Sequence, residues 1–319
     1  MQLDRMTVGR MAKEMGFVRD TLEKVCRLAD VLKFMEDDEL LSVSIALKGG
    51  TAINLTIFDL PRLSVDIDLD YCKSLDRDKM LMDRAIITER LNKYMVANDY
   101  VLSPKSKNYH ALDSFVYEYV NAGGVRNNLK IEINYMLRVH VLPVARREVK
   151  LPWSQDKLTV LSVAPLEIYA SKIVALLTRT APRDLYDVHN MVKFGLFDES
   201  EEEMLRKCAV FYSAIGAERP PENFELDSVG RVSTMQIKRD LNPVLRKGEQ
   251  FHLEEVQKEI REYLASVLVP TQKEVEFWKT FAQGEYLPKL VFGAGRELAN
   301  VEKHPMAIWK CRDKKQGGF

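Results

Sequence analysis

The sequence predicts an α+β protein with a sheet-forming first half and a mainly helical second half. Three observations favour this fold class. Apolar and polar residues alternate, as they do in strands, in several short segments before residue 150. In the segments between them, and in most of the chain after Pro152, apolar residues instead recur every three or four positions. No internal repeat or low-complexity tract interrupts this order.

The first strong helical pattern covers residues 17–35, where apolar residues recur at steps of four and three from Val18 to Leu32. Gly16 separates it from a second helical pattern, and together they have the form of a helix-turn-helix. A short helix, a glycine turn and a packing helix have the same form, and we favour that interpretation. The alternation that follows in residues 41–47 predicts a strand.

That strand ends at Lys48-Gly49-Gly50-Thr51, after which a helical spacing resumes until Pro61. Residues 64–70 then alternate polar and apolar without exception, which predicts a second strand. Its apolar residues face the core, and its aspartates share the other face: Asp66, Asp68 and Asp70.

A helical pattern covers residues 76–98, and two further strands are expected at residues 114–120 and 129–135, joined by a glycine turn. Beyond Pro152 the pattern is helical, first at residues 166–179 and then from Arg183. We therefore place a lobe boundary near residues 150–160. The expected divisions are a sheet-containing lobe with N-terminal packing helices (1–155), a helical C-terminal lobe (156–310) and a flexible basic tail (311–319).

The composition narrows the class of protein. The 319 residues include 47 basic and 47 acidic ones, so the formal net charge is zero, which excludes a protein that coats nucleic acid over its whole surface. The apolar fraction of 46% and charged fraction of 29% are those of a globular protein. Four scattered cysteines without metal-finger spacing, and no long apolar run, predict a cytoplasmic protein that does not enter a membrane.

The two glycines at Gly49 and Gly50 end a strand and begin a helix. Glycine lets the backbone approach a ligand, and the first amides of a helix point at anions, so this loop could cradle phosphate. It is not a Walker A loop, since the six-residue spacing and the Gly-Lys-Ser/Thr ending are missing. Glycine pairs also close ordinary turns, so this signal alone is weak.

Asp66 and Asp68 lie two positions apart on one strand face, about 7 Å at their Cα atoms, close enough to share divalent cations. A solvated polar strand face has the same pattern. Glu132 strengthens the functional interpretation, because it occupies the polar face of the strand expected at 129–135. If the two strands are neighbours, three carboxylates converge, as a two-metal phosphoryl-transfer centre requires.

The helical half contributes a second group of candidates. Lys172 lies on its helix away from the apolar stripe, and Arg179 is seven residues further along the same face. Asp184 and Asp187 stand one turn apart at the start of the next helix. Lys172 could reach a phosphate, although a solvated lysine is the alternative, and capping of exposed amides is the alternative for the aspartates.

Taken together, these motifs resemble those of the AbiEii/AbiGii nucleotidyltransferase-like toxin family, distant relatives of DNA polymerase β. The matching segments cover nearly the whole chain, in order: KGGTAI, LPRLSVDIDLDY, LKIEINY, PLEIYASKIVALLTRTAPRDLYDV, RDLNPVLRK and FWKTFAQGEYLPKLVF. The resemblance implies a nucleotidyltransferase fold, a small mixed β-sheet flanked by helices and followed by a mainly helical lobe.

The resemblance also implies roles for particular residues. The nucleotide would be bound by Lys48, Gly49, Gly50, Thr51, Arg62, Ser64, Lys172 and Asp187. Two Mg²⁺ ions, with Mn²⁺ as an alternative, would be held by Asp66, Asp68 and Glu132. These three carboxylates, with Lys172 and Asp184, would form the catalytic set.

The implied activity is metal-dependent transfer of a nucleotide from an NTP to an acceptor, which for some members is the 3′ end of tRNA. Members are toxins of bacterial toxin-antitoxin modules linked to phage defence, so a cognate antitoxin is an expected partner. Scattered basic residues could form a local wall for RNA: Arg126, Lys130, Arg138, Arg146, Arg147 and Lys150.

Two other classes of function stay open at this stage. One is a catalytically silent module that binds nucleotide or antitoxin and would tolerate loss of Glu132. The other is a sugar-nucleotide transferase that uses Asp66-Ile67-Asp68 as a metal-binding motif, although the glycine loop and the second aspartate pair would then have no role.

Overall fold

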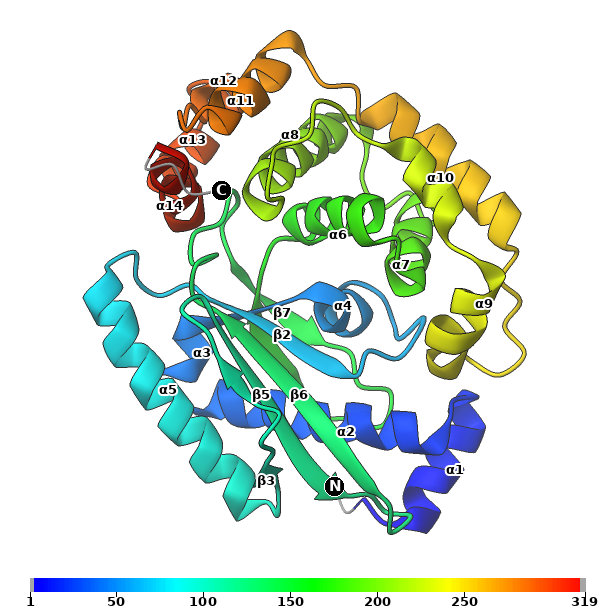
Figure 1. Cartoon of the computed structure of the whole chain (residues 1–319). Helices are drawn as coiled ribbons and strands as arrows, with labels where there is room; N and C mark the ends of the chain where they lie inside the picture. Colours follow the sequence, from blue (N-terminus) through cyan, green and yellow to red (C-terminus); the bar gives the residue numbers. More distant parts are fainter. Residues whose placement is uncertain (1–2, 316–319) are drawn as a thin grey trace. The chain divides into compact units, whose positions relative to one another are not determined.

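A computed structural model describes residues 3–315 of the chain (Figure 1). The chain folds into two compact units. Unit 1 comprises Met1–Arg138, Val144–Val163 and Asn242–Glu249, and unit 2 comprises Val139–Pro143, Ala164–Leu241 and Gln250–Phe319.

Unit 1 contains one mixed eight-stranded sheet with the order β3-β5-β6-β2-β1-β8-β7, and β4 pairs with β5. The strands are β1 (Ile45–Lys48), β2 (Asp66–Tyr71), β3 (Val101–Leu102), β4 (Lys107–Asn108), β5 (Leu112–Val120), β6 (Arg126–Asn134), β7 (Ala145–Val149) and β8 (Leu158–Ser162). The expected fold class, a mixed sheet flanked by helices and followed by a helical unit, is confirmed (Figure 1).

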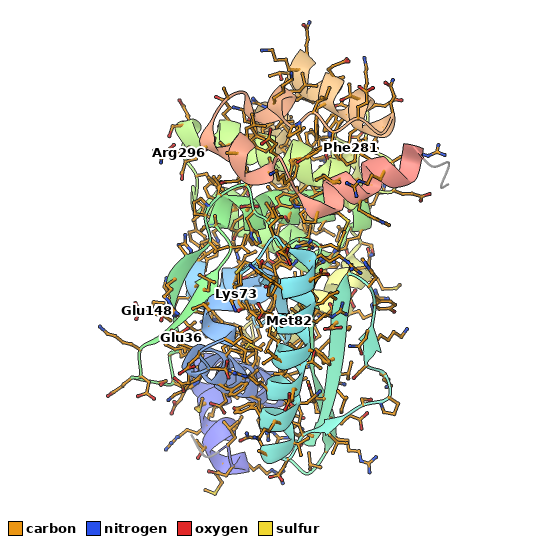
Figure 2. All side chains as sticks on the ribbon, turned by 90° about the vertical axis from the view of Figure 1, so that its left-hand side faces the viewer. Glu36, Lys73, Met82, Glu148, Phe281 and Arg296 are labelled. Carbon is orange, nitrogen blue, oxygen red and sulfur yellow. The ribbon has the colours of Figure 1, made fainter. Side chains whose placement is uncertain are left out.

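The helices of unit 1 lie on both sides of this sheet (Figure 1). They are α1 (Arg5–Met15), α2 (Arg19–Asp37), α3 (Leu41–Ser44), α4 (Gly49–Ala52), α5 (Arg77–Ala97), the π-helical turn η1 (Ile53–Ile57) and the 3₁₀ turn η4 (Asn242–Val244). The hydroxyl of Tyr71 donates to Asp83 of α5 at 2.8 Å, and the guanidinium of Arg27 on α2 lies 4.3 Å from the Tyr119 ring centre. The outer side of α5 carries Met82, which is 68% exposed (Figure 2).

The strict alternation in β2 decides which of its residues face α2 and α5. Ile67 and Leu69 are at most 2% exposed, and so are their partners in β6, Ile131 and Ile133. They share a sheet face with Tyr71, so the aspartates between them lie on the opposite face. Burial of this apolar layer fixes the register, since a slip of one residue would bring the carboxylates into the core.

Two expectations for the sheet were wrong. The strand expected at residues 41–47 begins only at Ile45, because the Asp38 carboxylate accepts the amide hydrogens of Leu40 and Leu41 and initiates the helical turn α3. Four strands were not expected: β3 and β4, with two residues each, and β7 and β8, with five each. The loop between β7 and β8 contains Pro152.

These two strands also determine where unit 1 ends. Residues 156–163, expected in the second lobe, belong to unit 1 because β8 pairs with β1 in parallel and with β7 in antiparallel orientation. A later segment of the chain returns to unit 1 as well. The carbonyl of Val244 accepts from the Leu63 amide at 2.8 Å, and the Arg246 guanidinium donates to the carbonyls of Met15 and Leu60 at 2.8 and 3.2 Å.

Unit 2 is helical within the described residues. Its elements are α6 (Pro165–Arg179), α7 (Pro182–Lys193), α8 (Glu199–Gly216), η2 (Leu226–Arg231), α9 (Thr234–Gln236), η3 (Ile237–Leu241), α10 (Leu253–Val267), α11 (Gln272–Ala282), α12 (Lys289–Phe292), α13 (Arg296–Val301) and α14 (Pro305–Lys315). Helix α6 packs on α8, and Phe211 of α8 contacts Phe277 of α11. The indole of Trp278 is 1% exposed and donates to the Val210 carbonyl at 3.0 Å.

Of the tail expected at residues 311–319, residues 311–315 complete α14, and residues 316–319 lie outside the described part of the chain. None of the helices in that described part is long and apolar enough to cross a membrane.

Candidate functional site

The glycine loop at the end of β1 packs directly against a carboxylate. Gly49 has a φ of +67°, a conformation that glycine adopts without strain. A Cβ at this position would lie only 2.5 Å from Oδ2 of Asp68, and a Cβ on Gly50 would lie 2.8 Å from Nη2 of Arg62. Both glycines are therefore required because other groups occupy the space that a side chain would need.

The residues expected around the loop brace it to β2. The hydroxyl of Thr51, 0% exposed, donates to the Asp66 carbonyl at 2.5 Å and lies 3.0 Å from the hydroxyl of Ser64. Arg62 is 2% exposed, and its Nη1 donates to the Leu63 carbonyl at 2.9 Å. These side chains hold the loop in place, which leaves its backbone amides as the groups suited to a phosphate.

Asn54 belongs to this brace but was missed in the sequence. It is completely buried, its amide nitrogen donates to the Gly50 carbonyl at 2.7 Å, and its oxygen accepts from the backbone amide of Arg62 at 3.2 Å. The available signal was a single amide side chain in the otherwise apolar run after the loop, one helical turn after Gly50. A buried amide of this kind needs partners, and here it joins the two ends of the loop.

The strand carrying Glu132 is the neighbour of the strand carrying the aspartates, a pairing that the sequence left open. Strands β2 and β6 pair in parallel with Asp68 opposite Glu132 and Asp66 opposite Lys130. Residues that pair across neighbouring strands point to the same sheet face, and the strands are about 4.8 Å apart. Asp66, Asp68 and Glu132 therefore share the face opposite the helical core.

The third aspartate of β2 has a different environment. Asp70 is 3% exposed and accepts from the Lys48 ammonium at 2.5 Å. This ion pair joins β1 to β2 and neutralises Asp70. Lys48, expected to bind nucleotide, therefore has its ammonium engaged with a carboxylate of the sheet.

Glu132 also has a partner. Its Oε2 lies 2.9 Å from Nζ of Lys130, and their side chains are 25% and 39% exposed. Among residues 3–315 no group of three or more His, Cys, Asp or Glu side chains has the geometry to hold a metal ion. The donor atoms on this face are carboxylate oxygens, the ligand type that Mg²⁺ prefers. Asp66, Asp68 and Glu132 can therefore bind Mg²⁺ together once the Glu132 side chain turns away from Lys130.

In unit 2, the structure brings together the four candidates of the helical half. Nζ of Lys172 lies 2.7 Å from Oδ1 of Asp184 and 3.2 Å from Oδ2 of Asp187, and both carboxylates are at most 1% exposed. Arg179 donates to Asp184 through Nε at 2.6 Å. The aspartates thus serve mainly as partners of a buried ammonium. An ammonium has three N–H donors, so the third could donate to a phosphate oxygen.

This arrangement shifts the acidity of Asp184. Burial alone would raise its pKa, but the charges of Lys172 and Arg179 and their hydrogen bonds outweigh burial and lower the pKa below its usual value. Asp184 is therefore ionised at neutral pH. Removal of Lys172 would leave two buried carboxylates without their main countercharge.

The six basic residues expected to line an RNA surface do not form one row. Arg126 and Lys130 lie on β6, whereas Arg146 and Arg147 lie on β7, and three other strands separate β6 from β7. Arg146 also forms an ion pair with Glu36 of α2. Of these six residues, Arg126 and Lys130 are the ones on the strand that carries Glu132.

Comparisons with known proteins point to one family. A family model described as "Nucleotidyl transferase AbiEii toxin, Type IV TA system" matches residues 33–281. None of the curated proteins matches the sequence. Among solved structures, MenT4, a nucleotidyltransferase toxin from Mycobacterium tuberculosis H37Rv, is similar in fold, with a TM-score of 0.63 and 16% identity over 96% of this chain and 99% of that one.

A second solved structure, that of CdnC with ATP from E. coli MS115-1, aligns over 96% of this chain and 97% of its own. Its TM-score is 0.25 and its identity 15%.

Proposed function

Because the chain belongs to the AbiEii family of nucleotidyl transferase toxins, we propose that it transfers a nucleotide monophosphate from an NTP to the 3′ end of an RNA, with tRNA as the first candidate. The observation that carries this proposal is the pairing of β2 with β6, which puts Glu132 opposite Asp68 while the glycine loop packs against that same aspartate. A carboxylate face beside a phosphate cradle is what phosphoryl transfer requires.

In the proposed reaction the acceptor 3′-hydroxyl attacks the α-phosphorus of the NTP. A P–O bond forms, the bond to the bridging oxygen breaks, and pyrophosphate leaves with that electron pair. Two Mg²⁺ ions, or Mn²⁺, bound by Asp66, Asp68 and Glu132 would stabilise the charge that develops on the phosphoryl oxygens. The hydroxyl proton passes to a carboxylate of this face, for which Glu132 is our candidate.

Other residues of the chain bind and orient the nucleotide in this proposal. The backbone amides at Gly49 and Gly50 hold phosphate oxygens, and Thr51, Arg62 and Ser64 keep the loop rigid against β2. Within unit 2, Asp184 and Asp187 fix the position of the Lys172 ammonium, and a role for these three residues in nucleotide binding stays a prediction.

The family also implies a neutralising antitoxin, and we propose that the reaction is one that an antitoxin must suppress in the cell. The matching family, one of nucleotidyl transferases, does not favour the sugar-nucleotide transferase alternative. Expression of the chain with and without the gene beside it would reveal such an antitoxin as a rescue of growth.

The test is to incubate the purified protein with total RNA and each of the four NTPs labelled at the α-phosphate, with MgCl₂ or EDTA. We expect one labelled nucleotide to appear on a defined RNA only with the metal, and Asp66→Asn and Asp68→Asn to abolish the labelling. Asp78→Asn, an exposed aspartate of α5, is the matched control and should keep it. Metal-dependent nucleotide binding without any transfer would instead favour the catalytically silent module.

A further inference from the structure

The lysine between the candidate metal ligands has no role in the reaction as proposed above. Lys130 lies opposite Asp66 in the β2–β6 pair, and its ammonium contacts Oε2 of Glu132, which lies opposite Asp68. One positive charge thus stands among the three carboxylates proposed to bind metal. Because residues 130 and 132 are both on the outward face of β6, the contact spans two positions of the same strand.

The charges explain why a cation belongs at this place. Three carboxylates on adjacent positions of two strands repel one another, and a lysine ammonium reduces that repulsion when no metal is bound. A divalent ion supplies twice the charge and draws several carboxylate oxygens to itself. Lys130 and the ion are therefore competing partners for Glu132, and repulsion between the two cations favours departure of the ammonium once the ion is bound.

We propose that Lys130 is a positioning residue that holds Glu132 away from the metal site until a divalent cation displaces its ammonium. This inference rests on the proposed function, because it takes Asp66, Asp68 and Glu132 as the ligands. The proposal explains why the three carboxylates share one sheet face in residues 3–315 and yet lack the geometry to hold a metal ion.

The proposal makes Lys130 a determinant of metal affinity. Loss of its charge removes the competitor, so Lys130→Met binds divalent cations more tightly, by about five- to tenfold. This value allows for solvent screening, since the two side chains are 39% and 25% exposed. Lys130→Arg keeps the charge and stays near the affinity of the unmodified protein. In a Glu132→Gln background, Lys130→Met has little effect, because the carboxylate that the two cations share is gone.

The experiment measures Mn²⁺ alone, without nucleotide, binding to the full-length protein by titration calorimetry, with free Mn²⁺ checked by its electron paramagnetic resonance signal. The matched control is Lys107→Met. Lys107 is exposed and pairs with Ser114 of β5, and Ser114 in turn pairs with Glu132 of β6. Lys107→Met therefore removes the same charge from the same sheet at about 10 Å from Glu132. A purely long-range effect of net charge would tighten Mn²⁺ binding equally in both variants and would overturn the proposal.

Two further outcomes would also overturn it: unchanged Mn²⁺ affinity in Lys130→Met, as for an ordinary surface ion pair, or weaker NTP binding with no change for Mn²⁺, as for a phosphate ligand. Failure of this inference is distinguishable from failure of the proposed function. If Asp66→Asn leaves Mn²⁺ binding unchanged, the metal site itself is misplaced. If Asp66→Asn abolishes binding and Lys130→Met leaves it unaltered, only the role of Lys130 is wrong.

Discussion

The contact between Gly49 and Asp68 gives a sharp prediction for the substitution Gly49→Ala. Two penalties add in this variant. A non-glycine residue in the left-handed region costs about 1–2 kcal/mol. The new Cβ would also lie 2.5 Å from the Asp68 carboxylate, where ordinary contact begins at 3.4 Å, so that carboxylate must retreat by about 0.9 Å. Overpacking of this kind costs about 1–3 kcal/mol more.

The chain offers a matched control in Gly124. This glycine has a φ of +79°, in the turn between β5 and β6, and nothing lies within 4 Å of the place where its Cβ would stand. Gly124→Ala therefore carries the backbone penalty alone. The free energy of unfolding, from urea titration, should fall by about 1–2 kcal/mol in Gly124→Ala and by about 2–5 kcal/mol in Gly49→Ala.

The two variants should differ even more in activity. A shift of about 1 Å in a group that positions the reacting atoms can cost about a hundredfold in rate. We expect nucleotide transfer to fall by about that factor in Gly49→Ala and to change less than twofold in Gly124→Ala. Equal activity of the two variants in the labelled-NTP assay would refute the claim that the loop and Asp68 form one site.

The remaining predictions concern the buried charges and the brace. Lys172→Met should lower the unfolding free energy by about 3–5 kcal/mol, because Asp184 and Asp187 lose their buried countercharge, whereas exposed Lys193→Met should leave it nearly unchanged in the same urea titration. The pKa of Asp184 is lower in the folded protein than its unfolded value of about 3.8, so the ionised carboxylate stabilises the fold at higher pH. This stabilisation should be lost as the pH falls through the folded pKa. The melting temperature of Asp184→Asn should therefore depend less on pH below about pH 4 than that of the unmodified protein. Thr51→Val should cost about 1–3 kcal/mol by removing the donor to the Asp66 carbonyl, and Thr51→Ser should cost less; equal losses would contradict the brace.

The sequence was most informative where a single physical constraint acts on consecutive residues. The alternation from Ser64 to Asp70 follows from one buried and one open sheet face, so it predicted both strand β2 and the side on which its aspartates lie. The sequence did not show whether the strands carrying the aspartates and Glu132 are neighbours, and in the structure β2 pairs with β6. Helix α6 was predicted from its apolar stripe, and the start of α7 from the proline that follows α6.

What the sequence did not reveal depends on contacts between distant residues. The first half of the expected strand at 41–47 is helical because Asp38 caps it, an effect of side-chain hydrogen bonds that alternation does not report. Strand β8 has a mixed pattern over five residues and owes its place to pairing with β1, more than a hundred residues earlier. Asn54 and Lys130 have ordinary local contexts, and only their partners reveal what they do.

The central claim is that Asp66 and Asp68 hold the cation that binds the reacting nucleotide. Anomalous scattering from crystals of the full chain grown with Mn²⁺ and a non-hydrolysable NTP analogue tests it directly. The account predicts an Mn²⁺ peak in contact with both carboxylates, with the phosphates of the analogue at the amides of Gly49 and Gly50. Mn²⁺ and nucleotide bound together elsewhere on the chain, with this face empty, would contradict it.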